Sequence, residues 1–170
     1  MKFDVIIIGG DHQDAVEGLR YIKEGKSVCL IAKGGLIGVS PEARAEFAHS
    51  GGTLLCSDEV ASVDYNADGS IQSIETVNLK GTKLTAELYV LAAGRFVPGG
   101  LKSDMNHVWE PDFGADVQYA EDPETWCAED FFAPQPFERF GVLTSPEGIV
   151  LKGGRPVANL KVFGEIIAKQ

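Results

Sequence analysis

A pair of glycines near the amino terminus is the feature of the sequence whose chemistry is clearest. Gly9 and Gly10 follow the apolar run 4–8 and precede a segment in which Ala15, Leu19 and Ile22 recur at helical spacing. A glycine turn at a helix start presents free backbone N–H groups, and the helix dipole adds positive charge there. Because both favour anions, the sequence predicts a phosphate-type site at this turn.

The turn departs from the glycine pattern of dinucleotide sites at two positions. That pattern needs a second glycine for close approach to the diphosphate and a third for contact between helix and strand. Asp11 and Asp14 stand at those positions. Asp11 is predicted to cap the helix, which would put a carboxylate where a cofactor phosphate otherwise binds. At about 4 Å two unit charges repel by ~1 kcal/mol in water and ~4 kcal/mol at an effective surface dielectric.

Few other side chains are candidates for chemistry. His12 lies beside the turn and would either touch a phosphate or ribose or face solvent. His49, near the end of a short helix, suits the helix dipole, and His107 lies in an irregular loop, where a substrate role stays open beside a structural one. The sequence contains no nucleophile–base pair, zinc-ligand spacing or Walker-type loop.

Two basic residues follow predicted strands. Lys33 stands where a dinucleotide site that binds the adenosine ribose would have Asp or Glu. Arg95 comes directly after Ala93 and Gly94, at the end of an apolar strand. It would either offset the charge of Asp11 near the diphosphate or form a salt bridge with an aspartate of the turn.

Composition limits the class of protein. The 170 residues suit one domain, and the net charge of −10 argues against nucleic acid or an anionic membrane as the main partner. Cys29, Cys56 and Cys127 show no CxxC spacing, which favours a reducing, cytoplasmic location. We expect neither a membrane-spanning segment nor a signal peptide.

The order of predicted elements indicates an α/β fold. A βαβ unit comes first, and a helix, a strand, a three-stranded antiparallel meander and an apolar strand follow. Their ranges are 4–8, 11–24 and 27–32, then 41–50, 53–56, 60–65, 70–79, 83–85 and 88–94. This order predicts a Rossmann-like FAD/NAD(P)-binding domain with a parallel sheet and a β-meander. Beyond it we expect an irregular region 101–140, a pairing of 140–143 with 149–151, and a last strand at 160–164.

Several motifs in the second half carry a family resemblance. They are the stretch DFFAPQP at 130–136, Glu110–Pro111, and the segment 159–164 with Glu165. With these, the chain resembles the B-subunit family of anaerobic glycerol-3-phosphate dehydrogenase. The resemblance implies a flavin-dependent oxidoreductase that passes electrons to an iron–sulfur partner, and it puts Gly164 and Glu165 near the flavin ribityl chain. The candidate FAD-binding residues are Gly9, Gly10, Asp11, His12, Asp14, Lys33, Ala93, Gly94, Arg95, Gly164 and Glu165.

Departures from the family pattern leave two classes of function open. The glycine turn carries aspartates, and we expect one domain, 1–170, that lacks the substrate cap and the flavin-facing helix. One class is a working flavoprotein subunit that oxidises glycerol 3-phosphate or a similar alcohol. The other is a flavoprotein-like core with weak or absent FAD binding, acting as an accessory or regulatory module. In the second class the aromatic stretch 126–140 would contact a partner protein or a second copy.

Overall fold

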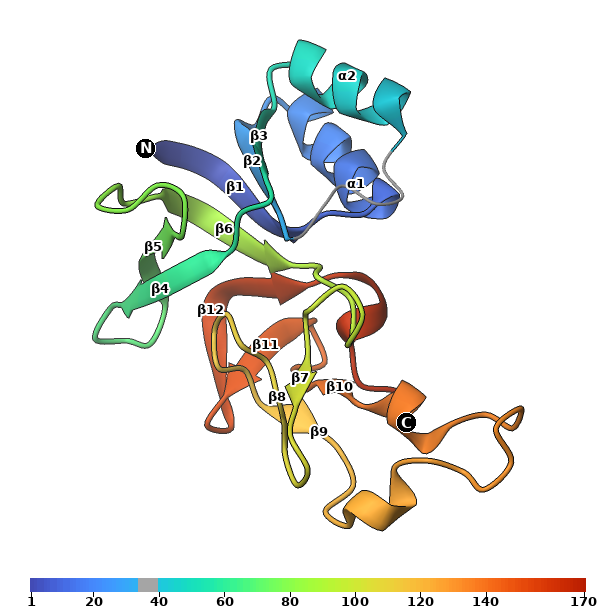
Figure 1. Ribbon diagram of the computed structural model, residues 1–170. Coiled ribbons are helices and arrows are strands. Elements are labelled where there is room, and N and C mark those ends of the chain that lie inside the picture. Colours follow the sequence, from blue (N-terminus) through green and yellow to red (C-terminus); the bar gives the residue numbers. More distant parts are fainter. Residues whose placement is uncertain (34–39) are drawn as a thin grey trace.

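A parallel sheet organises the computed structural model, which describes residues 1–33 and 40–170 (Figure 1). Within these residues the main sheet has six strands in the order β11-β12-β6-β1-β2-β3. Neighbouring strands from β12 to β3 run parallel, and β11 pairs antiparallel with β12 at one edge. The strands are β1 (Lys2–Gly9), β2 (Val28–Ala32), β3 (Thr53–Cys56), β6 (Thr85–Leu91), β11 (Ile149–Lys152) and β12 (Arg155–Val162).

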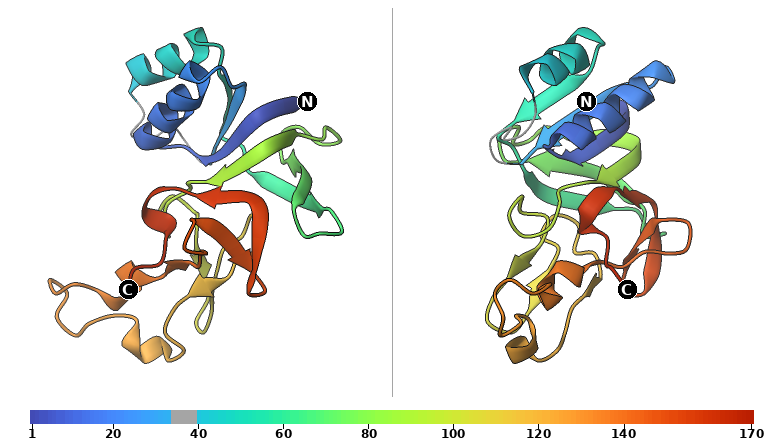
Figure 2. Two further views of the ribbon diagram at one scale, coloured as in Figure 1. Left: turned by 180° about the vertical axis from the view of Figure 1, so that it is seen from behind. Right: turned by 90° about the vertical axis from the view of Figure 1, so that its right-hand side faces the viewer.

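Two helices cover one face of the sheet, as two directions of view in Figure 2 show. Helix α1 (His12–Lys23) and helix α2 (Pro41–His49) pack with Val5 and Ile7 of β1 in one buried cluster. Ile6 and Ile8 alternate with them and point into the core on the opposite face. Burial on both faces explains why β1 reads as a continuous apolar run. None of the helices within the described ranges is both long and apolar enough to cross a bilayer.

The opposite face is covered by a hairpin and by the second half of the chain. Strands β4 (Val60–Tyr65) and β5 (Ile71–Thr76) form the hairpin. The predicted third strand of the meander is one antiparallel bridge, in which Ile74 and Leu84 exchange N–H···O bonds of 2.9 and 2.8 Å. The Asn159 side chain joins the hairpin to β12, because its amide accepts from the Ile71 N–H at 2.8 Å and donates to the Ile71 carbonyl at 2.9 Å.

The region 101–140 is irregular, as predicted, and contains only short elements among the residues described. These are β7 (Lys102–Ser103), β8 (Val108–Trp109), β9 (Val117–Gln118) and the 3₁₀ helices η1 (Pro123–Thr125) and η2 (Pro136–Arg139). Strand β10 (Gly141–Val142) pairs with β9. The expected pairing of 140–143 with 149–151 is confirmed at one end, where the Leu151 N–H donates to the Leu143 carbonyl at 3.0 Å beside a Thr144–Val150 bridge. It is wrong for Gly141 and Val142, which pair with β9 instead. A last 3₁₀ helix, η3 (Gly164–Ile166), follows β12.

Candidate cofactor-binding site

The candidate residues come together at one edge of the sheet. Parallel pairing sets Gly9 of β1 beside Ala32 of β2, and Leu91 of β6 between Ile8 and Val162. The segments that follow β1, β2, β6 and β12 therefore leave the sheet side by side. Open α/β sheets bind ligands at this carboxyl edge, where the strand order reverses beside β1.

Asp11 and Asp14 bond to each other's backbone at the turn after β1. Asp11 caps α1, and its Oδ1 accepts the Asp14 N–H at 2.9 Å. Asp14 reaches back, and its Oδ2 accepts the N–H groups of Gly10 at 2.7 Å and Asp11 at 3.0 Å. This reciprocal capping box satisfies amides that a glycine turn would otherwise offer to an anion. The prediction that Asp11 caps the helix is confirmed, while the bonds of Asp14 to these two amides were not predicted.

Gly9 makes the room that the Asp14 side chain occupies. A methyl group on Gly9 would lie 2.7 Å from the Asp14 carboxyl carbon and 3.2 Å from the Ala92 carbonyl oxygen. Asp14 is only 2% exposed, and this burial raises the pKa of its carboxyl group to about 7, with Asp11 adding repulsion. In the glycine pattern the third glycine lets the helix pack closely on the strand. Here the Asp14 carboxyl group lies between helix and strand, and the absence of a side chain on Gly9 leaves the space for it.

Lys33 forms a buried ion pair. Its Nζ donates to the Asp112 Oδ2 at 2.7 Å and to the Gly99 carbonyl at 3.1 Å, and the two side chains of the pair are 7% and 3% exposed. Gly34 and Gly35, which follow it in the sequence, lie outside the described residues. Lys33 thus connects the end of β2 to a loop, and its ammonium donates there to protein acceptors.

Glu110 organises that loop. Its side chain is 1% exposed and accepts three backbone N–H groups, from Asp112 at 2.7 Å, Phe113 at 2.8 Å and Ala115 at 3.1 Å. Burial, with repulsion from Asp112, raises the pKa of Glu110 despite these bonds. The Glu110–Pro111 motif therefore fixes the loop that presents Asp112 to Lys33. No pattern in the sequence signals that ion pair, because its partners lie 79 residues apart.

Arg95 makes its contacts away from the aspartates. Its Nε donates to the Phe140 carbonyl at 2.9 Å and its Nη2 donates to the Ile167 carbonyl at 3.3 Å. The expected salt bridge from Arg95 to Asp11 or Asp14 is wrong for the residues described, since the guanidinium is held by these two carbonyls instead. Arg95 therefore joins the end of β6 to the carboxyl-terminal segment.

The remaining candidates also lie at strand ends. Ala93 is buried, and Gly94 has a φ of +70°, a conformation that suits glycine and lets the Pro98 ring pack against it. Gly164 (φ +84°) and the exposed Glu165 begin η3, directly after β12. These four positions are close to the sheet edge, and their contact with a cofactor stays a prediction.

The histidines lie at separate places. His12 starts α1, and its side chain lies outside the described part of the chain. His49 is exposed at the last position of α2. His107 is exposed and its Nδ1 lies 3.3 Å from an Asp104 carboxylate oxygen. Among the described residues, no group of three or more His, Cys, Asp or Glu side chains is arranged to hold a metal ion.

Comparison with known proteins identifies a family for this chain. Residues 10–169 match the family model described as FAD binding domain. The chain belongs to this family of FAD-binding domains.

Two curated relatives give a narrower affiliation. The chain is 35% identical over 129 residues to the B-subunit of anaerobic glycerol-3-phosphate dehydrogenase from Glaesserella parasuis serovar 5 (strain SH0165), covering 73% of this chain and 30% of that one. It is 34% identical over 124 residues to the same-named protein of Vibrio vulnificus (strain YJ016), covering 72% and 28%. The chain is thus a relative of this dehydrogenase component, and it spans less than a third of the length of these relatives.

A solved structure of thioredoxin reductase from T. acidophilum is also similar. It is 21% identical to this chain with a TM-score of 0.40, and the match covers 55% of this chain and 36% of that one.

Proposed function

We propose that this chain is an FAD-binding-type domain whose affinity for FAD is weak or lost and which acts as an accessory or regulatory subunit. The observation that carries the proposal is the Asp14 carboxyl group, which accepts the N–H groups of Gly10 and Asp11. A cofactor diphosphate at this turn would need the same backbone donors.

The energetic argument follows from the geometry. A diphosphate would have to displace the Asp14 carboxyl group and then lie beside Asp11. Repulsion between two unit charges at about 4 Å is ~4 kcal/mol at an effective surface dielectric. Since 1.4 kcal/mol is tenfold in affinity, that repulsion corresponds to a loss of about a thousandfold. The residues at the turn therefore fit a diphosphate poorly.

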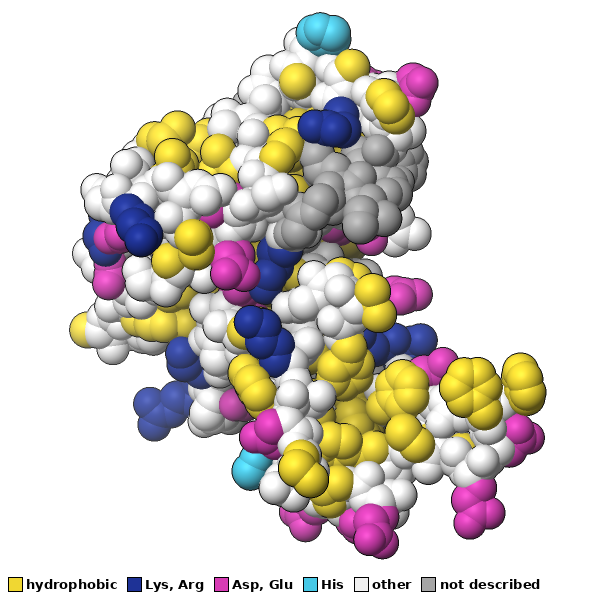
Figure 3. All heavy atoms as spheres, in the orientation of Figure 1, with side chains coloured by type: hydrophobic (Ala, Val, Ile, Leu, Met, Phe, Trp, Pro, Cys, Tyr) yellow, Lys and Arg dark blue, Asp and Glu magenta, His cyan; other side chains and the backbone are white. Residues whose placement is uncertain are grey.

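An exposed aromatic segment supports the accessory role. Phe131 and Phe132 are 85% and 92% exposed. Figure 3 shows hydrophobic side chains gathered at the lower right, where the segment 120–140 extends away from the sheet in Figure 1. Such a patch is typical of a surface that contacts another protein. We therefore propose that 126–140 contacts a partner subunit or a second copy, in the cytoplasm, where the free Cys56 and Cys127 would stay reduced.

The family match favours a second candidate function. The matched region runs from 10 to 169 and so includes both the turn and the segment after β12. On this reading the domain binds FAD, oxidises glycerol 3-phosphate or a similar small alcohol, and passes electrons to an iron–sulfur partner.

FAD binding separates the two candidates. We would record the visible spectrum of the purified chain and titrate it with FAD by calorimetry, alongside the double variant Asp11→Gly/Asp14→Gly. The double variant is expected to bind FAD at least tenfold more tightly than the natural chain. A matched control, Glu87→Gln/Glu147→Gln, removes two exposed carboxylates elsewhere and should leave the affinity unchanged.

Three outcomes would contradict the proposal. They are a purified chain that carries stoichiometric FAD, a double variant with no gain, or a control that gains as much as the double variant. If Asp14→Gly impairs folding, Asp11→Gly alone serves, because glycine at a helix cap costs only a few tenths of a kcal/mol. Reduction of a bound flavin by glycerol 3-phosphate would establish the second candidate.

A further inference from the structure

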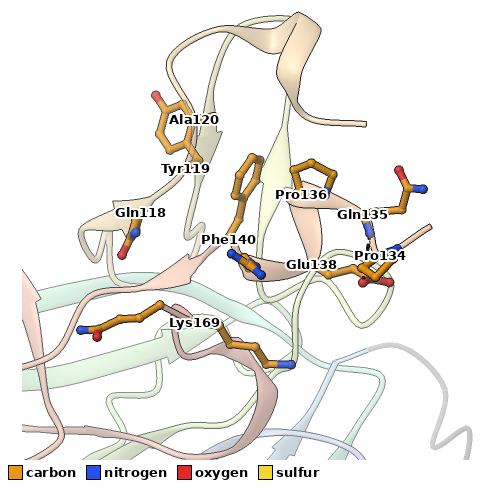
Figure 4. A pocket seen from close by; sticks show the side chains of 11 residues that line it. Gln118, Tyr119, Ala120, Pro134, Gln135, Pro136, Glu138, Phe140 and Lys169 are labelled. Atoms are coloured by element: carbon orange, nitrogen blue, oxygen red, sulfur yellow. Dashed lines mark hydrogen bonds between the residues drawn. The ribbon is translucent and has the colours of Figure 1, made fainter. Parts of the chain in front are cut away.

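A cavity lies between the aromatic half of the chain and its carboxyl-terminal segment. Its volume is about 650 Å³, within the range of small-molecule sites. Figure 4 shows Tyr119 and Phe140 on one side of it and Lys169 on the opposite side. The lining residues come from 118–120, 134–136, 138–140 and 169–170. None of them belongs to the turn after β1, so this is a second site.

One wall of the cavity is a packed aromatic group. The Phe140 ring lies edge-on to Tyr119 at 6.2 Å and to Trp126 at 5.9 Å between ring centroids. Phe140 is only 5% exposed, and the Trp126 Nε1 donates to the Ala120 carbonyl at 2.8 Å. Because each ring is fixed by the others, the wall is rigid before any ligand arrives.

Backbone bonds hold the two sides of the cavity together. The Lys169 N–H donates to the Arg139 carbonyl at 3.0 Å, and the Ala168 N–H donates to the Val142 carbonyl at 3.1 Å. Arg95 adds a side-chain link, since its guanidinium donates to the carbonyls of Phe140 and Ile167. The spacing between the aromatic wall and the carboxyl-terminal segment is therefore set by the fold.

The polar side chains of the cavity differ in whether they already have hydrogen-bond partners within the protein. The Gln135 amide is occupied, because it donates to carbonyls of the loop 130–133 and accepts the Ala128 N–H. Glu138 accepts the Gln135 N–H at 3.3 Å. Across the described part of the chain, the side chains of Arg139 and Lys169 form no hydrogen bond or ion pair with protein groups. The Glu138 carboxylate also lines the cavity, but among the described residues it forms no ion pair with Arg139 or Lys169, so both cations stay available to a bound anion.

We propose that this cavity binds a small organic anion, with a planar apolar body against Tyr119 and Phe140 and a carboxylate or phosphate group on Arg139 and Lys169. The aromatic wall supplies stacking surface, and the two cations supply the charge that orients the ligand. The proposal is independent of whether FAD binds at the turn.

Calorimetry with matched ligands tests the site. The probes are 2-naphthoate, 2-naphthyl phosphate and the uncharged 2-naphthylmethanol, titrated into the 170-residue chain. Both anions are expected to bind once per chain, and the alcohol at least tenfold more weakly. Arg139→Gln and Lys169→Gln should each weaken anion binding about threefold to tenfold. Lys161→Gln, an exposed lysine of β12 outside the cavity, should have no effect.

The position of the site is checked on the natural chain, so the test does not depend on a variant that folds. In ¹H–¹⁵N spectra, 2-naphthoate should shift the amide signals of Ala120, Phe140 and Lys169. Absence of binding below 1 mM, equal affinity for anion and alcohol, or shifts confined to other parts of the chain would each overturn the proposal. The relative affinity of the two anions identifies the head group.

Discussion

The buried Asp14 carboxyl group should make the stability of this domain fall as the pH rises toward neutrality. Burial raises the pKa of Asp14 from 3.8 to about 7. The folded state therefore binds the Asp14 proton more tightly than the unfolded state does between these values. By linkage, the stabilisation from that proton is complete below about pH 3.8 and is lost as the pH rises to about 7.

The magnitude follows from the shift. A change of about 3 pKa units, at 1.36 kcal/mol per unit, gives a loss of about 4 kcal/mol as an upper figure. The side chain is only 2% exposed, so solvent screens this effect little. Repulsion from Asp11 acts in the same direction, because it also opposes the charged form of Asp14.

The assay is urea unfolding of the natural chain and of Asp14→Asn at several pH values from 4.5 to 8. Asparagine keeps an acceptor oxygen for the amides of Gly10 and Asp11 but does not titrate. Other groups whose pKa burial raises, such as Glu110 and Asp112, are present in both proteins and cancel in the difference. The free energy of unfolding of the natural chain, relative to the variant, should fall by about 2–4 kcal/mol across this range. A difference that stays flat with pH would refute the reasoning.

Two further substitutions test packing at the same edge. Gly9→Ala should lower the free energy of unfolding by about 1–3 kcal/mol, because the added methyl group meets the Asp14 carboxyl group, and the loss should shrink in an Asp14→Gly background. Lys33→Met should cost about 3–5 kcal/mol in urea unfolding, since it leaves the buried Asp112 carboxylate unpaired. The double variant Lys33→Met/Asp112→Leu should recover most of that loss, and no recovery would contradict the ion-pair argument.

Local sequence patterns predicted the first half of the fold. Residues 5–8 and 28–32 are apolar because they are buried on both faces, and Asp11 caps the helix between them as its residue type predicts. The same logic predicts that the ends of β1, β2, β6 and β12 meet at one edge, which parallel pairing confirms, while the role of the candidate residues there stays a prediction.

Contacts between distant parts of the chain could not be predicted. Arg95 bonds to the backbone carbonyls of Phe140 and Ile167. Because every residue has a backbone carbonyl, the sequence does not indicate which carbonyls will accept these bonds. Asp14 was predicted only to depart from the glycine pattern. Its bonds to two amides depend on the space beside Gly9, which appears only when helix and strand are packed.

The link between Asn159 and Ile71 has a consequence for the order in which the chain can fold. The Asn159 amide takes the place of a peptide unit of a neighbouring strand, and it does so across 88 residues. The hairpin can form early from its own local contacts and the Ile74–Leu84 bridge, but its bonds to Asn159 must wait until β12 has been synthesised. During synthesis on the ribosome, the link between the hairpin and β12 would therefore be among the last contacts to form.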